Sequence, residues 1–273
     1  MAAVSQREQA ELFRSYHLAP PALVLPNVWD VASAVVVART PGARALATTS
    51  AGVAWSRGYP DGEVIPRDEM LEEVRRIVDA VELPVTADLE GGYGDPGETA
   101  RLAIEAGAVG LNLEDGIRHQ VLRPIDEAVE SVGAVIAAGE QAGVPLVVNA
   151  RTDVFLVGAG SAEEQLETAI ERLNAYLDAG ADCGFAVGAR EPEVIQRLAR
   201  EVRGPVSIFA GPGWPTIAEL ESLGVARISA ATRTATAAYS LVAAIGQELF
   251  STGTYEHMVP AADPPPNLNE LLA

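Results

Sequence analysis

Short apolar runs alternate with amphipathic stretches along most of the chain. The apolar runs have the length of buried strands, and several of them end in polar or glycine-rich segments. On this basis we predict strands at residues 22–28, 45–50, 84–90, 110–115, 146–152, 183–188, 205–211 and 227–231.

The stretches between these strands show the apolar spacing of helices. Residues 67–78 give the plainest case, because their apolar positions recur at helical intervals between charged residues. Further helices are predicted at residues 31–39, 97–106, 126–142, 162–179, 192–202, 216–223 and 235–250. Glycines that are typical of helix C-termini precede several strands, at Gly107, Gly143, Gly180 and Gly224.

Eight strands, each followed by a helix, predict a (β/α)8 barrel of the TIM type. A doubly wound open sheet is the alternative, but eight units favour closure. We expect a single barrel domain over residues 1–260. Residues 261–273 include Pro264-Pro265-Pro266 and are expected to form an extended C-terminal arm that lies on a neighbouring subunit.

The charged residues exclude several classes of function. The chain has 273 residues and a formal net charge of −19, which argues against nucleic acid as a partner because phosphate binding requires a basic surface. All 19 basic residues are arginines. The absence of lysine excludes a Schiff-base aldolase, a pyridoxal-phosphate enzyme and a Walker-type nucleotide loop, since each of them requires lysine.

The remaining composition restricts cofactors and location. Cys183 is the single cysteine, so we expect neither an intrachain disulfide nor a cysteine metal cluster. His17, His119 and His257 include no ligand-spaced pair, which argues against a histidine-bound zinc site. The chain shows no apolar run of about 18 residues and no signal-peptide pattern. We therefore expect no membrane association and a cytoplasmic location.

Two consecutive predicted strands end in carboxylates. Asp88 and Glu90 are two positions apart and point to the same face, and Glu114 and Asp115 end the next strand. Gathered carboxylates repel one another unless a cation lies among them, and Mg²⁺ prefers such oxygen ligands. We predict a Mg²⁺-dependent enzyme. Helix capping is the alternative role for Asp88 and Glu90, and turn formation is the alternative for Asp115.

The carboxyl ends of barrel strands meet at one face, where active sites lie. Polar and small residues recur at these ends, at Asn27, Trp29, Asp30, Ser50, Gly52, Asn149, Arg151 and Asp153. Ser50, followed by two small residues, either binds a ligand or forms a tight turn. Arg151 either recognises an anion or forms a structural ion pair with Asp153 or with an acid of the preceding strand.

Segments at these strand ends resemble the phosphoenolpyruvate mutase/isocitrate lyase superfamily in their order and spacing, and the likeness covers most of the chain. They are Asn27-Val28-Trp29-Asp30, Thr49-Ser50-Ala51-Gly52-Val53-Ala54, Gly58-Tyr59-Pro60-Asp61, Asp88-Leu89-Glu90-Gly91-Gly92-Tyr93-Gly94, Leu113-Glu114-Asp115 and Asn149-Ala150-Arg151-Thr152-Asp153. The resemblance implies a barrel whose last helix is exchanged with a neighbour in a homotetramer, a dimer of dimers. It also implies Mg²⁺ chemistry, with Mn²⁺ as the alternative. A C–C or P–C bond next to a 2-oxo acid, or in a phosphonate, would be made or broken through an enolpyruvate-like intermediate.

The same resemblance implies roles for matching residues. Asp88, Glu90 and Glu114 would hold the metal or its waters. Ser50, with the backbone N–H groups of Ala51 and Gly52, would bind the substrate carboxylate and keto oxygen. Arg151 would stabilise the enolate or the migrating group, and Asp61 lies on a loop that closes over the substrate in relatives.

This chain departs from the family pattern in one loop and at one ligand position. The Lys-Lys-Cys-Gly-His segment of isocitrate and methylisocitrate lyases is replaced by residues 116–124, which contain neither cysteine nor lysine, so an isocitrate lyase is not expected. The lysine and asparagine of the mutases are absent as well, and Arg118, His119 or Arg123 is the expected substitute. Glu90 stands where most members have an aspartate.

The altered loop leaves two interpretations open. The first is an enzyme of lyase or phosphonomutase type, with Arg151, Asp61 and His119 as catalytic residues and a solvated loop position as the alternative for His119. The second is a catalytically drifted barrel that serves as a metabolite-binding or assembly module. Retention of the carboxylates favours the enzyme, because buried charges are costly. Trp29 and Tyr93 are expected to wall the pocket, with core packing as the alternative.

Overall fold

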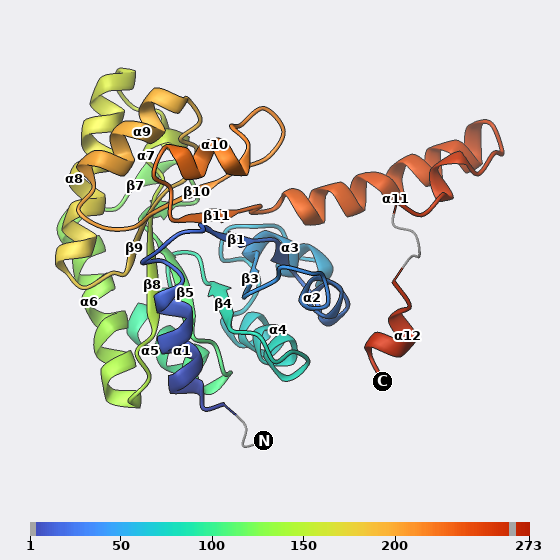
Figure 1. The fold of residues 1–273 in the computed structure, drawn as a ribbon, viewed down its shortest axis with the longest axis horizontal. Coiled ribbons are helices and arrows are strands. Elements are labelled where there is room, and N and C mark those ends of the chain that lie inside the picture. The colour runs from blue at the N-terminus through green and yellow to red at the C-terminus, as the bar shows by residue number, and fades with distance from the viewer. Residues whose placement is uncertain (1–3, 262–265) are drawn as a thin grey trace.

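The computed structural model describes residues 4–261 and 266–273. Its main sheet is parallel, with strands in the order β1-β11-β10-β9-β8-β5-β4-β3-β2. The first and last strands of this order, β1 (Leu23–Leu25) and β2 (Asn27–Val28), are pieces of one segment interrupted at Pro26. Proline has no N–H for a strand ladder, which explains the interruption. The sheet closes around this break, so the predicted (β/α)8 barrel is confirmed (Figure 1).

The predicted strands are all present and are shorter than predicted at one end or both. The remaining barrel strands are β3 (Leu46–Thr48), β4 (Val85–Asp88), β5 (Gly110–Glu114), β8 (Val147–Thr152), β9 (Cys183–Ala186), β10 (Val206–Phe209) and β11 (Arg227–Ser229). An antiparallel hairpin that the pattern did not predict, β6 (Gly116–Ile117) and β7 (Val121–Leu122), follows β5. Its backbone projects from the carboxyl end of the barrel.

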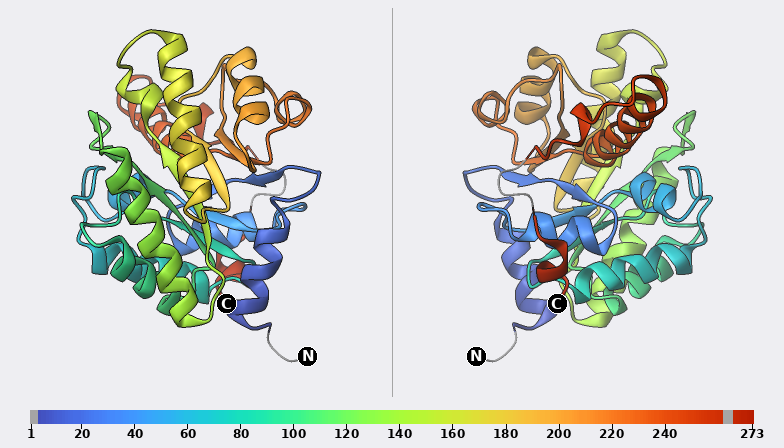
Figure 2. Two further views of the ribbon diagram at one scale, coloured as in Figure 1. Left: turned by 90° about the vertical axis from the view of Figure 1, so that its left-hand side faces the viewer. Right: turned by 90° about the vertical axis from the view of Figure 1, so that its right-hand side faces the viewer.

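All the predicted helices except the last, α11, surround the barrel, and several neighbours in this outer layer contact one another (Figures 1 and 2). They are α2 (Val31–Ala38), α4 (Arg67–Asp79), α5 (Pro96–Glu105), α6 (Ile125–Ala142), α8 (Ala162–Asp178), α9 (Pro192–Glu201), α10 (Ile217–Ser222) and α11 (Arg233–Ser251). The glycines predicted to end helices have positive φ values between 68° and 106°, as a left-handed helix end requires. Short elements that were not predicted are α3 (Ser50–Ser56), α7 (Val154–Val157), the 3₁₀ helix η1 (Glu256–Met258) and α12 (Leu268–Leu271).

A further unpredicted helix, α1 (Gln6–Ser15), covers the amino-terminal end of the barrel. Arg14 at its end pairs with Asp182, just before β9, at 2.6 Å. Phe13 lies on the buried side of α1, and its ring centroid is 5.7 Å from the guanidinium carbon of Arg227, the first residue of β11. The barrel is therefore plugged at the end opposite to the predicted site.

The carboxyl-terminal part of the chain leaves the barrel. Helix α11 projects away from it (Figure 1) and exposes Leu241, Val242 and Phe250, the last with 94% of its surface accessible. Residues 262–265 of the expected arm lie outside the described residues, and α12 beyond them contacts α2. No helix in the described part of the chain is long and apolar enough to span a membrane.

His17, next to α1, is a buried imidazole whose protonation is coupled to folding. Its Nδ1 lies 3.0 Å from the Phe13 carbonyl oxygen, and its Nε2 lies 3.4 Å from Nη1 of Arg227. Because arginine can only donate, Nε2 accepts and Nδ1 carries the proton. Burial, followed by the charge of Arg227, lowers the pKa of His17 to about 3. The imidazole is neutral in the folded protein.

We expect this histidine to make the fold sensitive to acid. Below about pH 6.5 the His17 imidazole is protonated in the unfolded chain, whereas in the folded chain it stays neutral down to about pH 3. The free energy of unfolding therefore falls as the pH drops through this window. Between about pH 7.5 and pH 5 the loss from His17 amounts to about 2 kcal/mol. Urea unfolding at both pH values measures how much unfolding free energy is lost on acidification. This loss should be smaller by about 2 kcal/mol in His17→Gln than in the wild type, because the titrating imidazole is gone. The control His257→Gln should lose as much as the wild type. Equal losses in all three proteins would contradict the assignment.

Candidate active site

A cavity of about 230 Å³ lies at the carboxyl ends of the barrel strands. Of the residues singled out from the sequence, it is lined by Asn27, Ser50, Ala51, Asp61, Asp88, Glu90, Glu114, His119 and Arg151. A larger groove of about 490 Å³ lies at the other end of the barrel, but among the described residues His17 and Glu221 are the only titratable side chains that line it. The smaller cavity is the candidate active site, because it gathers the carboxylates and cations.

Two neighbouring strands place matched rows of polar side chains inside the barrel. Asn112 and Glu114 on β5 point to one side, as do Asn149 and Arg151 on β8, because strand side chains alternate. The parallel register pairs Asn112 with Asn149 and Glu114 with Arg151. Asn149 Nδ2 accordingly donates to Asn112 Oδ1 at 2.8 Å, and Arg151 Nη1 lies 2.7 Å from Glu114 Oε2.

Asp88, the last residue of β4, receives hydrogen bonds from two sides. Its Oδ2 accepts from the backbone N–H and the hydroxyl of Ser50, at 3.0 and 2.8 Å, and its Oδ1 accepts from Asn112 Nδ2 at 3.2 Å. Ser50 begins α3, where the first N–H groups of a helix have no partner within it. The start of α3 therefore fixes the Asp88 carboxylate at the edge of the cavity.

Glu90 lies just beyond β4 in a turn and has a positive φ of 52°. The backbone N–H of Glu63 donates to its Oε2 at 2.6 Å. Burial, followed by the charges of Asp61 and Asp88, raises the pKa of Glu90 to about 8. The carboxylate is buried among like charges, a situation that a bound cation or a proton relieves.

Arg151 joins two buried carboxylates. Besides Glu114, it contacts Asp153, whose Oδ1 accepts from Arg151 Nε at 2.6 Å. Burial raises the pKa of Glu114 to about 8, although the charge of Arg151 opposes this shift. Burial would also raise the pKa of Asp153, but the hydrogen bond from His119 and the charge of Arg151 hold it below its ordinary value. Arg151 thus forms the structural ion pairs considered above and also lines the cavity.

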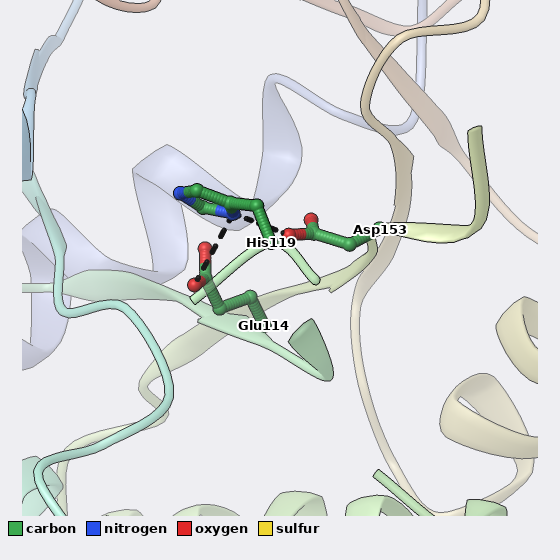
Figure 3. Close-up of side chains that lie close together, drawn as sticks. All are labelled: Glu114, His119 and Asp153. Carbon is green, nitrogen blue, oxygen red and sulfur yellow. Dashed lines mark hydrogen bonds and ion pairs between the residues drawn. The ribbon is translucent and has the colours of Figure 1, made fainter. Parts of the chain in front are cut away.

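His119 extends into the cavity from the β6–β7 hairpin. Its Nδ1 lies 2.6 Å from Asp153 Oδ2 and 4.0 Å from Glu114 Oε1, and Figure 3 shows both contacts. The hydrogen bond to Asp153, followed by the nearby carboxylate of Asp61, raises the pKa of His119 to about 10, so the ring is positively charged at neutral pH. Arg151 Nη2, at 3.2 Å from the same Nδ1, is also a donor, and the two cations share Asp153.

The loop that carries Asp61 and the hairpin that carries His119 meet at the cavity. Asp61 lies on the first loop, and its Oδ2 is 3.8 Å from Nε2 of His119 on the second. Glu63 ties the first loop to the turn after β4, because its Oε1 accepts from the Tyr93 N–H at 2.7 Å. A side chain at Gly116 would collide with the Asp153 carboxylate, so the hairpin can approach this closely only with glycine there.

Three predicted substrate-binding residues do not line the cavity. Trp29 packs against Tyr239 of α11, with ring centroids 6.3 Å apart. Gly52 packs against Trp29, so that a Cβ atom at position 52 would lie 2.9 Å from the Cβ of Trp29. The Tyr93 hydroxyl lies 3.5 Å from Glu90 Oε1, so Tyr93 contacts the site through that carboxylate.

Asp115 does not line the cavity either. It is buried and accepts hydrogen bonds from the Thr152 hydroxyl, the Asp153 N–H, Arg172 and the Tyr176 hydroxyl, at 2.7 to 3.0 Å. These contacts tie the end of β5 to β8 and α8. Asp115 therefore positions the strand ends that carry Glu114 and Asp153.

Two sets of side chains could hold a metal ion. Glu114, His119 and Asp153 each offer an atom within 4.8 Å of the others. A cation there would compete with Arg151 and with the charged His119, which already neutralise Asp153. Asp88, Glu90 and Glu114 face the same cavity, and the two glutamates are held close to neutrality by burial and repulsion. This oxygen-only set fits a hard divalent cation better.

Sequence reasoning missed several residues of the site. Asn112 links Asp88 to the buried Arg227, whose Nη2 donates to Asn112 Oδ1 at 3.2 Å, and its inward position could have been read from Glu114 two residues later. Arg233 lines the cavity from the end of β11, where the strand-end rule also applies. Glu63, in an irregular loop, gave no sequence signal.

The chain is similar to known proteins both in sequence and in structure. The family model of phosphoenolpyruvate phosphomutase matches residues 13–250. The chain is 31% identical over 217 residues to 2-methylisocitrate lyase of Bacillus subtilis strain 168, covering 76% of this chain and 68% of the lyase. A crystal structure from Burkholderia cenocepacia J2315, provisionally described as a phosphonomutase, has 44% identity and a TM-score of 0.84, covering 88% of this chain and 99% of that one.

A third similarity concerns a protein with a bound product. The structure of oxaloacetate acetylhydrolase in complex with its product oxalate has 26% identity to this chain and a TM-score of 0.84, and the match covers 97% of this chain and 93% of that one.

We expect the charge of His119 to depend on Asp153, since that contact is the largest cause of the raised pKa. In metal-free protein labelled with [13C]histidine, a pH titration by NMR should give His119 a pKa near 10 in the wild type and a value closer to 6.5 in Asp153→Asn. Asp95→Asn, at the exposed start of α5, is the control and should leave the titration unchanged. A high pKa that persists in Asp153→Asn would contradict the ion-pair assignment.

Proposed function

The chain belongs to the phosphoenolpyruvate phosphomutase family, and we propose that it is a Mg²⁺-dependent enzyme that makes or breaks a C–C or P–C bond next to a 2-oxo acid. Family membership supports the general function, namely an enzyme of the lyase and mutase superfamily that acts on 2-oxo acids. The observation that carries the finer proposal is the set of Asp88, Glu90 and Glu114 around one cavity, beside Ser50 and Arg151.

Asp88, Glu90 and Glu114 would hold the Mg²⁺ ion, directly or through water, and Mn²⁺ suits the same oxygen ligands. When bound, the ion supplies Lewis-acid polarisation of the substrate's keto and carboxylate oxygens. The raised pKa of Glu90 supports this assignment, because that carboxylate is buried beside the like charges of Asp61 and Asp88.

The first turn of α3 provides the binding site for the acid group of the substrate. The N–H group of Ala51 belongs to this turn and lines the cavity, where helix geometry leaves donors free, and Ser50 adds a hydroxyl. Ser50 also donates to Asp88, so one residue orients both the substrate acid and a carboxylate of the proposed metal site.

Arg151 and His119 act on the charge that develops when the bond breaks. Cleavage leaves an electron pair on the carbon next to the keto group, and the resulting enolate is anionic. Arg151 keeps N–H groups beyond those bonded to Glu114 and Asp153, and these can stabilise the enolate. His119, charged at neutral pH and facing the cavity, is a proton donor for the enolate carbon, and Asp61 lies on its Nε2 side.

His119 thereby occupies the loop in which the related lyases carry their general acid. The loops that bear Asp61 and His119 would exclude water while the enolate exists. A C–C lyase or hydrolase and a phosphonomutase share this half-reaction, and this chain has neither loop motif of its relatives. The drifted, non-catalytic alternative receives no support, since the relatives with named activities are enzymes.

We also propose that a second copy of the chain covers α11. The exposed apolar residues of α11 continue into Tyr255, Met258 and Val259 beyond it, and a patch of this kind marks an interface. Exchange of α11 between two barrels, in a dimer of dimers, would bury these side chains. The substrate partner remains a small 2-oxo acid or phosphonate.

Loss of Asp88 should abolish both ligand binding and turnover. In a thermal-shift titration with oxalate, a mimic of the enolpyruvate skeleton, the wild type should be stabilised when oxalate and Mg²⁺ are both present. Asp88→Ala should show no such shift, and its kcat/KM on any 2-oxo acid substrate should fall by at least about 100-fold. Asp126→Ala, an exposed acid at the start of α6, is the control. An unchanged shift in Asp88→Ala would remove this metal site, and no shift in the wild type would favour the non-catalytic alternative.

The assembly can be tested at α11. Phe250→Glu places a charge on the most exposed apolar side chain of the helix and should give a smaller particle by light scattering coupled to size exclusion. Val4→Glu changes another exposed apolar residue away from α11 and should leave the particle size unchanged. A wild type that is monomeric at micromolar concentration would contradict the proposed exchange.

A further inference from the structure

Arg227 is a charged residue in the interior of the barrel, where side chains are usually apolar. It begins β11, and its side chain is buried. With β1 and β2 counted as one strand, three strands separate β11 from β5 in either direction around the barrel. The Arg227 side chain therefore crosses the interior to donate from Nη2 to Oδ1 of Asn112 on β5, at 3.2 Å. The proposed chemistry gives this buried cation no role.

The surroundings of Arg227 compensate its charge only in part. Its Nη1 lies 3.4 Å from Nε2 of His17, and its Nε–H has no hydrogen-bond partner in the described part of the chain. Burial lowers the pKa of Arg227 to about 10, so the guanidinium is still charged at neutral pH, and the charge of Asp88 opposes the shift. Asn112 connects the two opposite charges, because it accepts from Arg227 and donates to Asp88.

The orientation of the Asn112 amide decides what Asp88 receives. In the observed orientation, Asn112 Oδ1 accepts from Asn149 Nδ2 and from Arg227 Nη2. Its Nδ2 donates to Asp88 Oδ1. Asn149 alone would permit either orientation, because its own Oδ1 has no partner among the described residues and could accept from a reversed Asn112. Arginine has donors but no acceptor, so Arg227 requires the Asn112 oxygen on its side and directs the amide N–H towards Asp88.

We propose that Arg227 is a positioning residue of the active site, which fixes the Asp88 carboxylate through the amide of Asn112. This inference rests on the proposed function, in which Asp88 is a ligand of Mg²⁺. Ser50 donates to Oδ2 of Asp88 and Asn112 donates to Oδ1, so the two residues together set the plane of the carboxylate. A reversed Asn112 amide would bring its oxygen against Asp88 Oδ1, and the repulsion would turn the carboxylate.

Positioning and simple electrostatics predict opposite effects of Arg227 on metal binding. The positive charge of Arg227 repels a dication, so loss of the charge alone would strengthen binding. Loss of the positioning contact would weaken binding, since outer-shell partners of metal ligands typically contribute about 10- to 100-fold in affinity. Mg²⁺ should be affected more than Ca²⁺, because Mg²⁺ requires a nearly ideal octahedron and Ca²⁺ tolerates irregular sites.

Arg227→Gln tests the inference, because glutamine can accept from Asn112 as well as donate to it. Dissociation constants for Mg²⁺ and for Ca²⁺ are measured by calorimetry. The Mg²⁺ constant should rise about 10- to 100-fold in Arg227→Gln, and the Ca²⁺ constant should rise by a smaller factor. His17→Gln is the matched control, because it changes the other hydrogen-bond partner of Arg227 and should leave both constants unchanged.

A double-variant cycle shows whether Arg227 acts through Asn112. Asn112→Leu should weaken Mg²⁺ binding at least as much as Arg227→Gln, and the double variant should bind no more weakly than Asn112→Leu alone. Additive losses would mean that Arg227 acts by another route, and would overturn the inference. Unchanged or tighter Mg²⁺ binding in Arg227→Gln, or equal losses for Mg²⁺ and Ca²⁺, would overturn it as well.

Neutron diffraction from crystals of the metal-free wild type provides a readout that requires no variant to fold. It distinguishes the deuterated amide nitrogen of Asn112 from the oxygen. The inference requires the nitrogen to face Asp88, and an oxygen in that place would contradict it. A wild type that binds oxalate with Mg²⁺ and an Arg227→Gln variant that binds equally well would leave the proposed function without the inference. A wild type that binds neither Mg²⁺ nor oxalate would contradict both.

Discussion

The register between β5 and β8 is the constraint on which the site depends. Pairing Glu114 with Arg151 and Asn112 with Asn149 places charged and polar side chains inside a barrel, where their desolvation is costly unless each finds a partner. A shift of one residue would turn these rows outward and apolar residues inward. The buried Asp115, with its four donors, fixes the same strand ends from the other side.

Charge in the cavity is divided unequally between its two sides. Near β8 and the hairpin, Arg151 and His119 compensate Glu114 and Asp153, so this half forms a closed network of ion pairs. Near β4, Asp88 receives only neutral donors, and Glu90 is buried beside Asp61 and Asp88. The excess of negative charge is therefore concentrated on the β4 side of the cavity, where the metal site is proposed.

Much of the barrel could be predicted because its signals are local. The apolar run and the glycine-rich turn around Asp88 identified a strand end, and the helical spacing of residues 67–78 predicted α4 almost to the residue. The hairpin β6–β7 and the short helix α3 could not be found in this way. Their sequences carry no periodicity, and contacts with Asp153 and Asp88, which are distant in the sequence, fix their positions.

By itself, the sequence determined the strand and helix order, the face on which the carboxylates gather and, through the resemblance, the family. These follow from apolar periodicity and from the rule that parallel strands end together. The tertiary structure alone decided which charges neutralise one another. It paired His119 with Asp153, placed Trp29 against Tyr239 outside the cavity lining, and stacked Arg233 on the rings of Phe209 and Trp214. Pairing depends on distances between residues far apart in the chain, and local sequence carries no information about these distances.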